Sequence, residues 1–174
     1  IILRAAEKDD IFLFHKWSND KALNFFIGPQ LPTSLNEEKE IFERNEQNEY
    51  RKVLIIDTKD GTSLGYLYLD FDWVNSKVKL SIAIAEIKFQ GMGFGKLALL
   101  KVLELIFNQY AFNKCYLYVF AFNERAISLY NKCGFAKEGL LKEDYQMNGS
   151  LQDRLIMSIF RKDFIKNNNA SVIT

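Results

Sequence analysis

The segment with the clearest capacity for chemistry is a glycine-rich loop, Gln90–Lys96, with the sequence QGMGFGK. It stands between a predicted strand and a predicted helix. Glycines let the backbone turn tightly and approach a ligand closely, and free N–H groups at a helix N-terminus bind anions. The loop therefore predicts a phosphate-binding site. The alternative is a plain strand-to-helix turn.

The charges around this loop favour the phosphate site. The first turn of a helix normally carries Asp or Glu, which complement the helix dipole. Here no acid follows the loop until Glu104, whereas Lys96 lies at the positive end of the helix. A cation there is unfavourable by about 0.3–1 kcal/mol unless an anion lies nearby. A bound pyrophosphate would remove the conflict.

Two common phosphate motifs do not fit the loop. The Walker pattern requires Ser or Thr after its Gly-Lys pair, but Leu97 follows Lys96. The dinucleotide fingerprint has the spacing Gly-x-Gly-x-x-Gly, whereas Gly91, Gly93 and Gly95 are separated by single residues. The phosphate ligand therefore belongs to a different class.

The sequence contains few residues that could build another kind of catalytic centre. The chain has one histidine, His15, and two cysteines, Cys115 and Cys133, which lack zinc-site spacing and are too few for a disulfide scaffold. This composition disfavours a histidine metal centre and a Ser-His-Asp triad. We expect no metal, and we expect the cysteines to be packing residues.

The predicted elements form an α/β (α+β) domain that positions the loop. Three consecutive strands predict an antiparallel meander, and the strand–helix–strand–helix order after it implies a parallel crossover. Strands are expected at Ile1–Ala5, Arg51–Asp57, Ser63–Phe71, Val78–Ala85 and Lys114–Phe120, and on both sides of Asn148-Gly149. Helices are expected from Asp9 or Asp10 to Trp17, from Leu35 to Asn48, from the loop to about Asn108, and from Asn123 to Lys132.

Length and composition are those of one globular domain. Of 174 residues, 48% are hydrophobic, and 23 Lys and Arg oppose 22 Asp and Glu. This balance implies no nucleic-acid or membrane partner, and the apolar segment Leu97–Phe107 is too short to span a bilayer. We expect a single domain over 1–166 and a polar, frayed tail over 167–174. No signal peptide is evident, so a cytoplasmic location is expected.

The loop resembles the Gln/Arg-x-x-Gly-x-Gly/Ala signature of the GCN5-related N-acetyltransferase (GNAT) family, as Gln90-x-x-Gly93-x-Gly95. The likeness extends over nearly the whole chain. Other segments resemble the subgroup of ribosomal-protein N-terminal and spermidine acetyltransferases. They are Leu3–Ala5, Trp17–Asp20, Asn123–Tyr130, Cys133–Phe135, Glu138-Gly139, Asn148-Gly149 and Asp153. Their order and spacing strengthen the resemblance, which implies a mixed sheet of about seven strands and about four helices.

The resemblance also implies acetyl-CoA as co-substrate and a place for it. In the family, the strand before the loop splays away from its parallel neighbour, and the pantetheine arm lies in the gap and pairs with the strand backbone. The loop amides hold the pyrophosphate. The residues so assigned are Ile82, Ala83, Ile84, Ala85, Gln90, Gly91, Met92, Gly93, Phe94, Gly95 and Lys96. By themselves, the strand residues are equally compatible with an ordinary core strand.

Catalytic roles follow from the same resemblance. Asn123 contacts the cofactor arm in the family, although it is also a natural helix N-cap. Tyr130, on the same helix face, protonates the departing thiolate, although periodicity alone indicates a core aromatic. The attacking amine must lose a proton. Glu86 is the expected base, with Tyr118 and Asp70 as weaker options, and Glu86 could equally be a solvated loop acid.

The expected reaction is direct attack of a primary amine on acetyl-CoA in a ternary complex. The acidic predicted helix with Glu37 and Glu38 and the aromatic residues Trp17, Phe25 and Phe26 favour a cationic acceptor, either a polyamine or a protein N-terminus. A solvated acidic face would also explain the carboxylates. The alternatives are an amino-sugar or antibiotic acceptor and a non-catalytic acyl-CoA-binding module. A homodimer is a further expectation.

Overall fold

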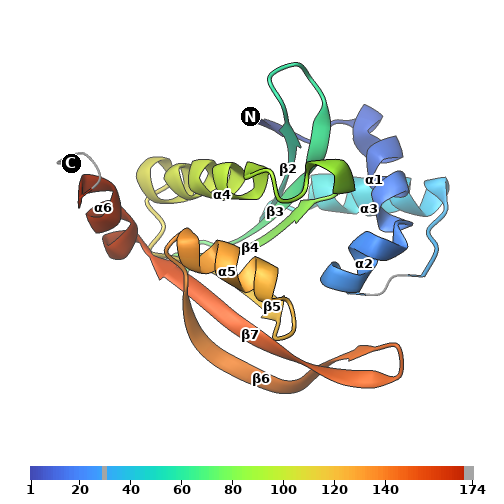
Figure 1. The fold of residues 1–174 in the computed structure, drawn as a ribbon. Coiled ribbons are helices and arrows are strands. Elements are labelled where there is room, and N and C mark those ends of the chain that lie inside the picture. Colours follow the sequence, from blue (N-terminus) through green and yellow to red (C-terminus); the bar gives the residue numbers. More distant parts are fainter. Residues whose placement is uncertain (29–30, 171–174) are drawn as a thin grey trace.

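The computed structural model describes residues 1–28 and 31–170, which form one mixed seven-stranded sheet (Figure 1). Its strand order is β1-β2-β3-β4-β5-β7-β6, and only the β4–β5 pair is parallel. The meander and the mixed sheet predicted from the sequence are confirmed. The strands are β1 (Ile2–Ala5), β2 (Arg51–Asp57), β3 (Ser63–Asp72), β4 (Lys77–Ile84), β5 (Lys114–Phe120), β6 (Ala136–Met147) and β7 (Ser150–Phe160).

Helices cover both faces of the sheet. One face packs against α4, α5 and α6, and the other against α1, α2 and α3 (Figure 1). The helices are α1 (Ile11–Ser18), α2 (Lys21–Ile27), α3 (Leu35–Gln47), α4 (Phe94–Glu104), α5 (Glu124–Lys132) and α6 (Arg161–Ala170). Short turns are η1 (Lys8–Asp10) and η2 (Ile87–Phe89), and η3 (Leu105–Gln109) continues α4 as a π-helix.

Each face of the sheet has its own apolar core. The larger core includes Leu99 and Phe107 from the α4–η3 segment and Phe164 from α6. The smaller core is built around Phe14 and Trp17 of α1. Buried apolar area contributes about 25 cal/mol per Å², so these two cores supply the main favourable term for folding. Both cysteines are buried in the larger core, as expected for packing residues.

The described residues form six α-helices, compared with about four in the sequence-based expectation. α2 was not predicted because its apolar residues span too few turns to establish a helical period. Its start is nevertheless encoded: Asp20 accepts hydrogen bonds from the N–H groups of Ala22 and Leu23. α6 was also not predicted. Its backbone extends to Ala170, into the segment expected to be a polar tail, and residues 171–174 lie outside the described residues.

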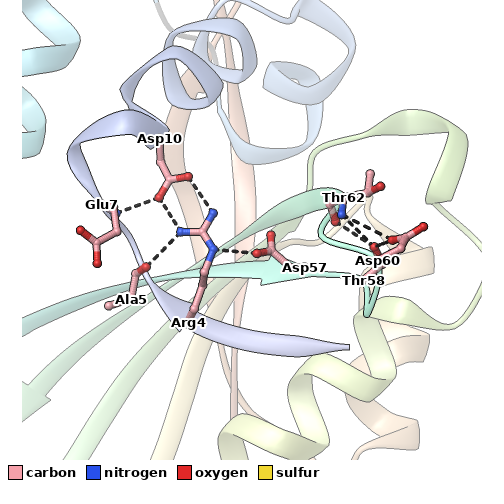
Figure 2. Close-up of polar contacts among 8 residues, drawn as sticks. All are labelled: Arg4, Ala5, Glu7, Asp10, Asp57, Thr58, Asp60 and Thr62. Carbon is pink, nitrogen blue, oxygen red and sulfur yellow. Dashed lines mark hydrogen bonds and ion pairs between the residues drawn. The ribbon is translucent and has the colours of Figure 1, made fainter.

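Arg4 joins β1 to its neighbouring strand and to the first helix (Figure 2). Its guanidinium donates to Asp57 of β2 over 2.6 Å and to both carboxylate oxygens of Asp10 over 2.7 Å. Burial opposes the charged form of Asp10, but the bonds from Arg4 and from the Glu7 N–H outweigh it and lower the pKa of Asp10. Asp10 occupies the expected N-cap position of α1, yet it makes no capping bond.

Strands β4 and β5 pair over a short distance and then separate. Their register runs only from Lys77 opposite Lys114 to Lys79 opposite Tyr116, although β4 continues to Ile84 and β5 to Phe120. The parallel pair is therefore splayed, as the resemblance implied. Beyond Lys79 and Tyr116, the facing backbone edges of β4 and β5 have no strand partner.

Two features are absent from the residues that the structure describes. No helix in this part of the chain is long and apolar enough to cross a membrane. Within the same residues, His, Cys, Asp and Glu side chains form no group of three or more that could hold a metal ion.

Candidate active site

The glycine-rich loop leads from β4 through η2 into α4. Gly91 and Gly93 have φ angles of 81° and 88°, in the left-handed region that favours glycine, and Gly93 is the N-cap residue of α4. A Cβ at either position would meet no other atom within 4 Å, so this side of the loop is open. The first turn of α4 contains no acid. Its N–H groups are therefore available to an anionic ligand.

Contacts from β4 and α5 fix the loop in place. Gln90 donates from Nε2 to the Ile84 carbonyl over 2.7 Å and accepts from Arg125 Nη1 over 3.2 Å. A Cβ on Gly95 would lie 3.2 Å from the Leu129 side chain, which shows how closely α4 approaches α5. Gln90 thereby links the end of the splayed strand to the start of α5.

Helix α5 carries the two other residues that the resemblance singled out. Asn123 is its N-cap and accepts a hydrogen bond from the Ala126 N–H over 3.1 Å. Tyr130 is 8% exposed and packs against Phe135, with 5.9 Å between ring centres. Burial raises the pKa of Tyr130 to about 12. Its phenol is therefore protonated at neutral pH and can donate a proton or a hydrogen bond.

A cavity of about 630 Å³ brings these groups together. It runs along the gap between β4 and β5 and is lined by parts of the loop and of α5. Several predicted residues lie on its wall, namely Ile82, Ala83, Ile84, Gln90, Gly91, Gly93, Gly95, Lys96, Tyr118, Asn123 and Tyr130. Three other residues assigned to the cofactor, Ala85, Met92 and Phe94, are not among the lining residues. Ala85 is buried in the smaller core, and Met92 is 63% exposed.

Glu86 lies outside this lining and is bound to α1. Its carboxylate accepts from the Trp17 indole N–H over 2.9 Å and pairs with the Lys16 ammonium. The hydrogen bond from Lys16 lowers the pKa of Glu86, against a smaller opposing effect of burial. Trp17 itself is 2% exposed and belongs to the smaller core. The weaker candidate Asp70 is paired with Arg51 and Lys79.

The acidic residues of α3 do not line the cavity. Glu37 completes a capping box with Ser34, in which its carboxylate accepts from the Ser34 N–H over 2.7 Å. Glu38 is buried, and it borders a small separate hollow with Phe14 and Tyr68. The structure therefore does not bring these two carboxylates together with the loop or with Tyr130.

The predicted aromatic pair on α2 lies at the edge of the cavity. Phe26 lines it, and Phe25 packs against both Phe26 and Phe122, with ring centres 5.0 Å and 5.4 Å apart. Phe120 and Tyr145 continue this aromatic wall, with 5.2 Å between their ring centres.

Several lining residues were not identified from the sequence. They come from α2, β4, α5, β6 and β7 and include Leu23, Lys79, Arg125, Lys132, Tyr145 and Arg154. Local spacing could not have identified Tyr145 and Arg154, because the pairing of β7 with β5, and of β6 with β7, is what brings them to the cavity. Arg125 could have been identified from the sequence, because it is a cation in the first turn of the helix that follows Asn123.

Comparisons with known proteins agree with this geometry. A family model described as an acetyltransferase (GNAT) domain matches residues 1–136. A spermidine N(1)-acetyltransferase of Vibrio cholerae is 25% identical over 166 residues, 95% of each chain. An uncharacterized, prophage-derived N-acetyltransferase of Bacillus subtilis, YokL, is 30% identical over 166 residues, covering 94% of this chain and 92% of that one.

Solved structures give the same result. A crystal structure of the Vibrio cholerae spermidine N-acetyltransferase in complex with CoA and spermine superposes with a TM-score of 0.88 at 26% identity, over 94% of this chain and 97% of that one. The family match spans most of the chain and includes the glycine-rich loop and Tyr130. The chain belongs to the GNAT family of acetyltransferases, as its motifs predicted.

Proposed function

We propose that this chain transfers an acetyl group from acetyl-CoA to a primary amine, by direct attack within a ternary complex. The observation that carries the proposal is the single cavity in which three features meet. These are the anion-binding loop, the unpaired edge of the splayed β4 strand, and the protonated hydroxyl of Tyr130. One ligand with a phosphate end, an amide-containing arm and a reactive end would use all three.

The residues present fit acetyl-CoA. The loop amides from Gly91 to Lys96 would hold the pyrophosphate, and Arg125 and Lys132 add positive charge on the facing helix. The backbone of Ile82 to Ile84 would pair with the pantetheine amides, because β5 no longer occupies that edge. Asn123 lies beside the same arm and caps α5 as well.

The proposed chemistry uses the acyl donor without a covalent enzyme intermediate. The lone pair of the amine attacks the thioester carbonyl carbon, the carbon–sulfur bond breaks, and the sulfur leaves as a thiolate. Tyr130 donates its proton to that sulfur, and the proton that the nitrogen loses after the attack returns to the phenolate through water. General acid assistance of this kind contributes about 10²–10⁴-fold in rate.

A different proton, which the ammonium loses before the attack, needs its own acceptor. An alkylammonium with a pKa of about 10.4 costs roughly 4–5 kcal/mol to deprotonate at pH 7. We propose Glu86 for this role, acting through water, because it directly follows the splayed strand and its carboxylate is ionised at neutral pH. Its bonds to Trp17 and Lys16 fix its position beside α1.

The relatives suggest which acceptors to test first. A similar protein of Vibrio cholerae is named for spermidine and has been solved with spermine, which makes spermidine and spermine the first candidates, with a peptide N-terminus beside them. The decisive experiment measures release of free CoA from acetyl-CoA across a panel of amines. Tight acetyl-CoA binding without CoA release from any amine would instead favour a non-catalytic acyl-CoA-binding module.

A further inference from the structure

The walls of the cavity restrict what kind of amine can enter it. Building on the proposed acetyl transfer, we infer that the acceptor is a monoamine with an apolar body and a carboxylate, rather than a polyamine. Arg154 is the residue that would bind the carboxylate. This assignment rests on the charge of the lining, on the partners of Arg154, and on the apolar residues around it.

The charged side chains that line the cavity are all cations. They are Lys79, Lys96, Arg125, Lys132 and Arg154. Over the described part of the chain, no Asp or Glu contributes to the lining. The cations near the loop suit the phosphates of CoA, but Lys79 and Arg154 are on strands β4 and β7. A polyamine in this space would place several positive charges among like charges, which is unfavourable at short range.

Two tyrosine rings on the cavity wall already face a protein cation. The Arg154 guanidinium lies 4.9 Å from the ring centre of Tyr118 and 5.3 Å from that of Tyr145. Cation–π binding requires a charge over a ring face within about 6 Å, and here a protein side chain supplies it. At these two rings, an incoming ammonium would have to displace Arg154. An anion would instead meet the guanidinium on its aromatic support.

Two acids that pair with cations of the lining are Asp144 and Asp70. Asp144 accepts a hydrogen bond from Nε of Arg154 and pairs with its Nη2, whereas Nη1 has no acceptor among the described residues. Asp70 is shared between Arg51 and Lys79, so two cations face one carboxylate. The hydrogen bonds of both partners hold the pKa of Asp70 low against the opposing effect of burial. Neither acid is free to attract a polyamine.

Apolar side chains line the end of the cavity that we assign to the acceptor. Leu23, Phe26 and Ile27 of α2 line it from one side, and Phe120 lies across from them. The end of α2 also touches the β6 strand, because a Cβ on Gly28 would lie 2.4 Å from the Tyr145 hydroxyl. This wall favours an aliphatic or aromatic body, whose burial gains about 25 cal/mol per Å².

The same cations would assist the attack. A positive charge near an ammonium lowers its pKa, so Lys79 and Arg154 favour the neutral amine that the reaction requires. A monoamine gains from this effect. A polyamine would either have to lose the charge on several nitrogens or keep charged nitrogens beside these cations.

The test compares amines with matched bodies on the full chain. Release of CoA is followed with phenylalanine, phenethylamine, spermidine and spermine. We expect kcat/KM for phenylalanine to exceed that for the other three by about tenfold or more, as a charge-assisted hydrogen bond implies. If no amine releases CoA, the acetyl transfer itself fails. If spermidine or spermine is preferred, only the acceptor inference fails.

Two variants assign the effect to Arg154. Arg154→Gln should raise KM for phenylalanine by about tenfold while changing that for phenethylamine far less, and Arg154→Lys should restore part of the loss. The matched control is Lys52→Gln, which removes an exposed cation from β2. Thermal melting establishes that each variant folds. An unchanged KM for phenylalanine in folded Arg154→Gln would overturn the inference.

Discussion

The indole N–H of Trp17 donates a hydrogen bond to Glu86 over 2.9 Å, and the neighbouring Lys16 pairs with the same carboxylate. The contact links the first helix of the chain to the residue that follows the splayed strand. The proposed proton acceptor is thus oriented by a buried aromatic residue that the sequence had suggested as part of the acceptor site. In the proposed mechanism, Trp17 would act on the site through Glu86.

Glu86→Gln should lower kcat by about 10²-fold at neutral pH, because the amide keeps a hydrogen-bond acceptor for Trp17 but cannot take a proton. Affinity for acetyl-CoA, measured by calorimetry, should stay unchanged. Lys16→Met is the matched control, since it removes the ion pair and leaves the carboxylate. Equal losses of kcat in the two variants would show that Glu86 serves only to hold α1 in place.

Tyr130→Phe should lower kcat by about 10²-fold or more and leave acetyl-CoA affinity near that of the wild type, because only the proton donor is lost. Burial raises the pKa of Tyr130 to about 12, so the phenol stays protonated through the alkaline range in which enzymes are assayed. A fall in kcat near pH 9 therefore belongs to another group. Such a fall in the wild type that disappears in Tyr130→Phe would contradict this assignment.

Gly93→Asp should abolish acetyl-CoA binding in calorimetry, because it adds a negative charge where the helix N-terminus would meet phosphate. The substitution is also strained, since Gly93 has φ of 88°. Gly61→Asp is the matched control, with φ of 86°, an equally open Cβ position and a place in the β2–β3 turn. Retained binding in folded Gly93→Asp would remove the phosphate assignment of the loop.

Arg4→Met should destabilise the fold by about 3 kcal/mol at pH 7, because it leaves the buried carboxylates of Asp10 and Asp57 without their cation. Arg44→Met, at an exposed position on α3, should have little effect. Chemical denaturation of the three proteins would give the free energies of unfolding.

The same network predicts how stability depends on pH. The folded protein lowers the pKa of Asp10 below its unfolded value of about 3.9. Its contribution is therefore complete above about pH 5 and is lost as the pH falls through the folded pKa. The melting temperature of the wild type should fall below about pH 4 more steeply than that of Arg4→Met. Parallel curves would show that Arg4 does not control the titration of Asp10.

The sequence predicted the parts of the fold that depend on local patterns. Apolar strand segments and the Asn148-Gly149 turn were sufficient for the strands, and three glycines with Lys96 were sufficient for the loop. Helix α2 was not predicted because it is short and its capping residue, Asp20, follows α1 almost directly. Its position matters to function, since it brings Leu23 and Phe26 to the cavity.

The acceptor end could not be predicted because it depends on long-range register. Arg154 reaches Tyr118 and Tyr145 only after β7 has inserted between β5 and β6. The position of the acidic residues of α3 relative to the cavity could not be predicted either. Its carboxylates are close in sequence, yet Glu37 caps its own helix and Glu38 faces the small core. Periodicity shows which residues share a helix face but not what that face contacts.

The splay between β4 and β5 also bears on how stable and how abundant the protein is in a cell. A sheet that is open between two internal strands lacks cross-strand hydrogen bonds that a ligand could supply, so an acyl donor bound there as proposed would also stabilise the folded state. Ligand at one hundred times its Kd would add about 2.7 kcal/mol to the free energy of unfolding. The abundance of the enzyme would then follow the supply of its acyl donor, through slower turnover by proteases when that supply is high.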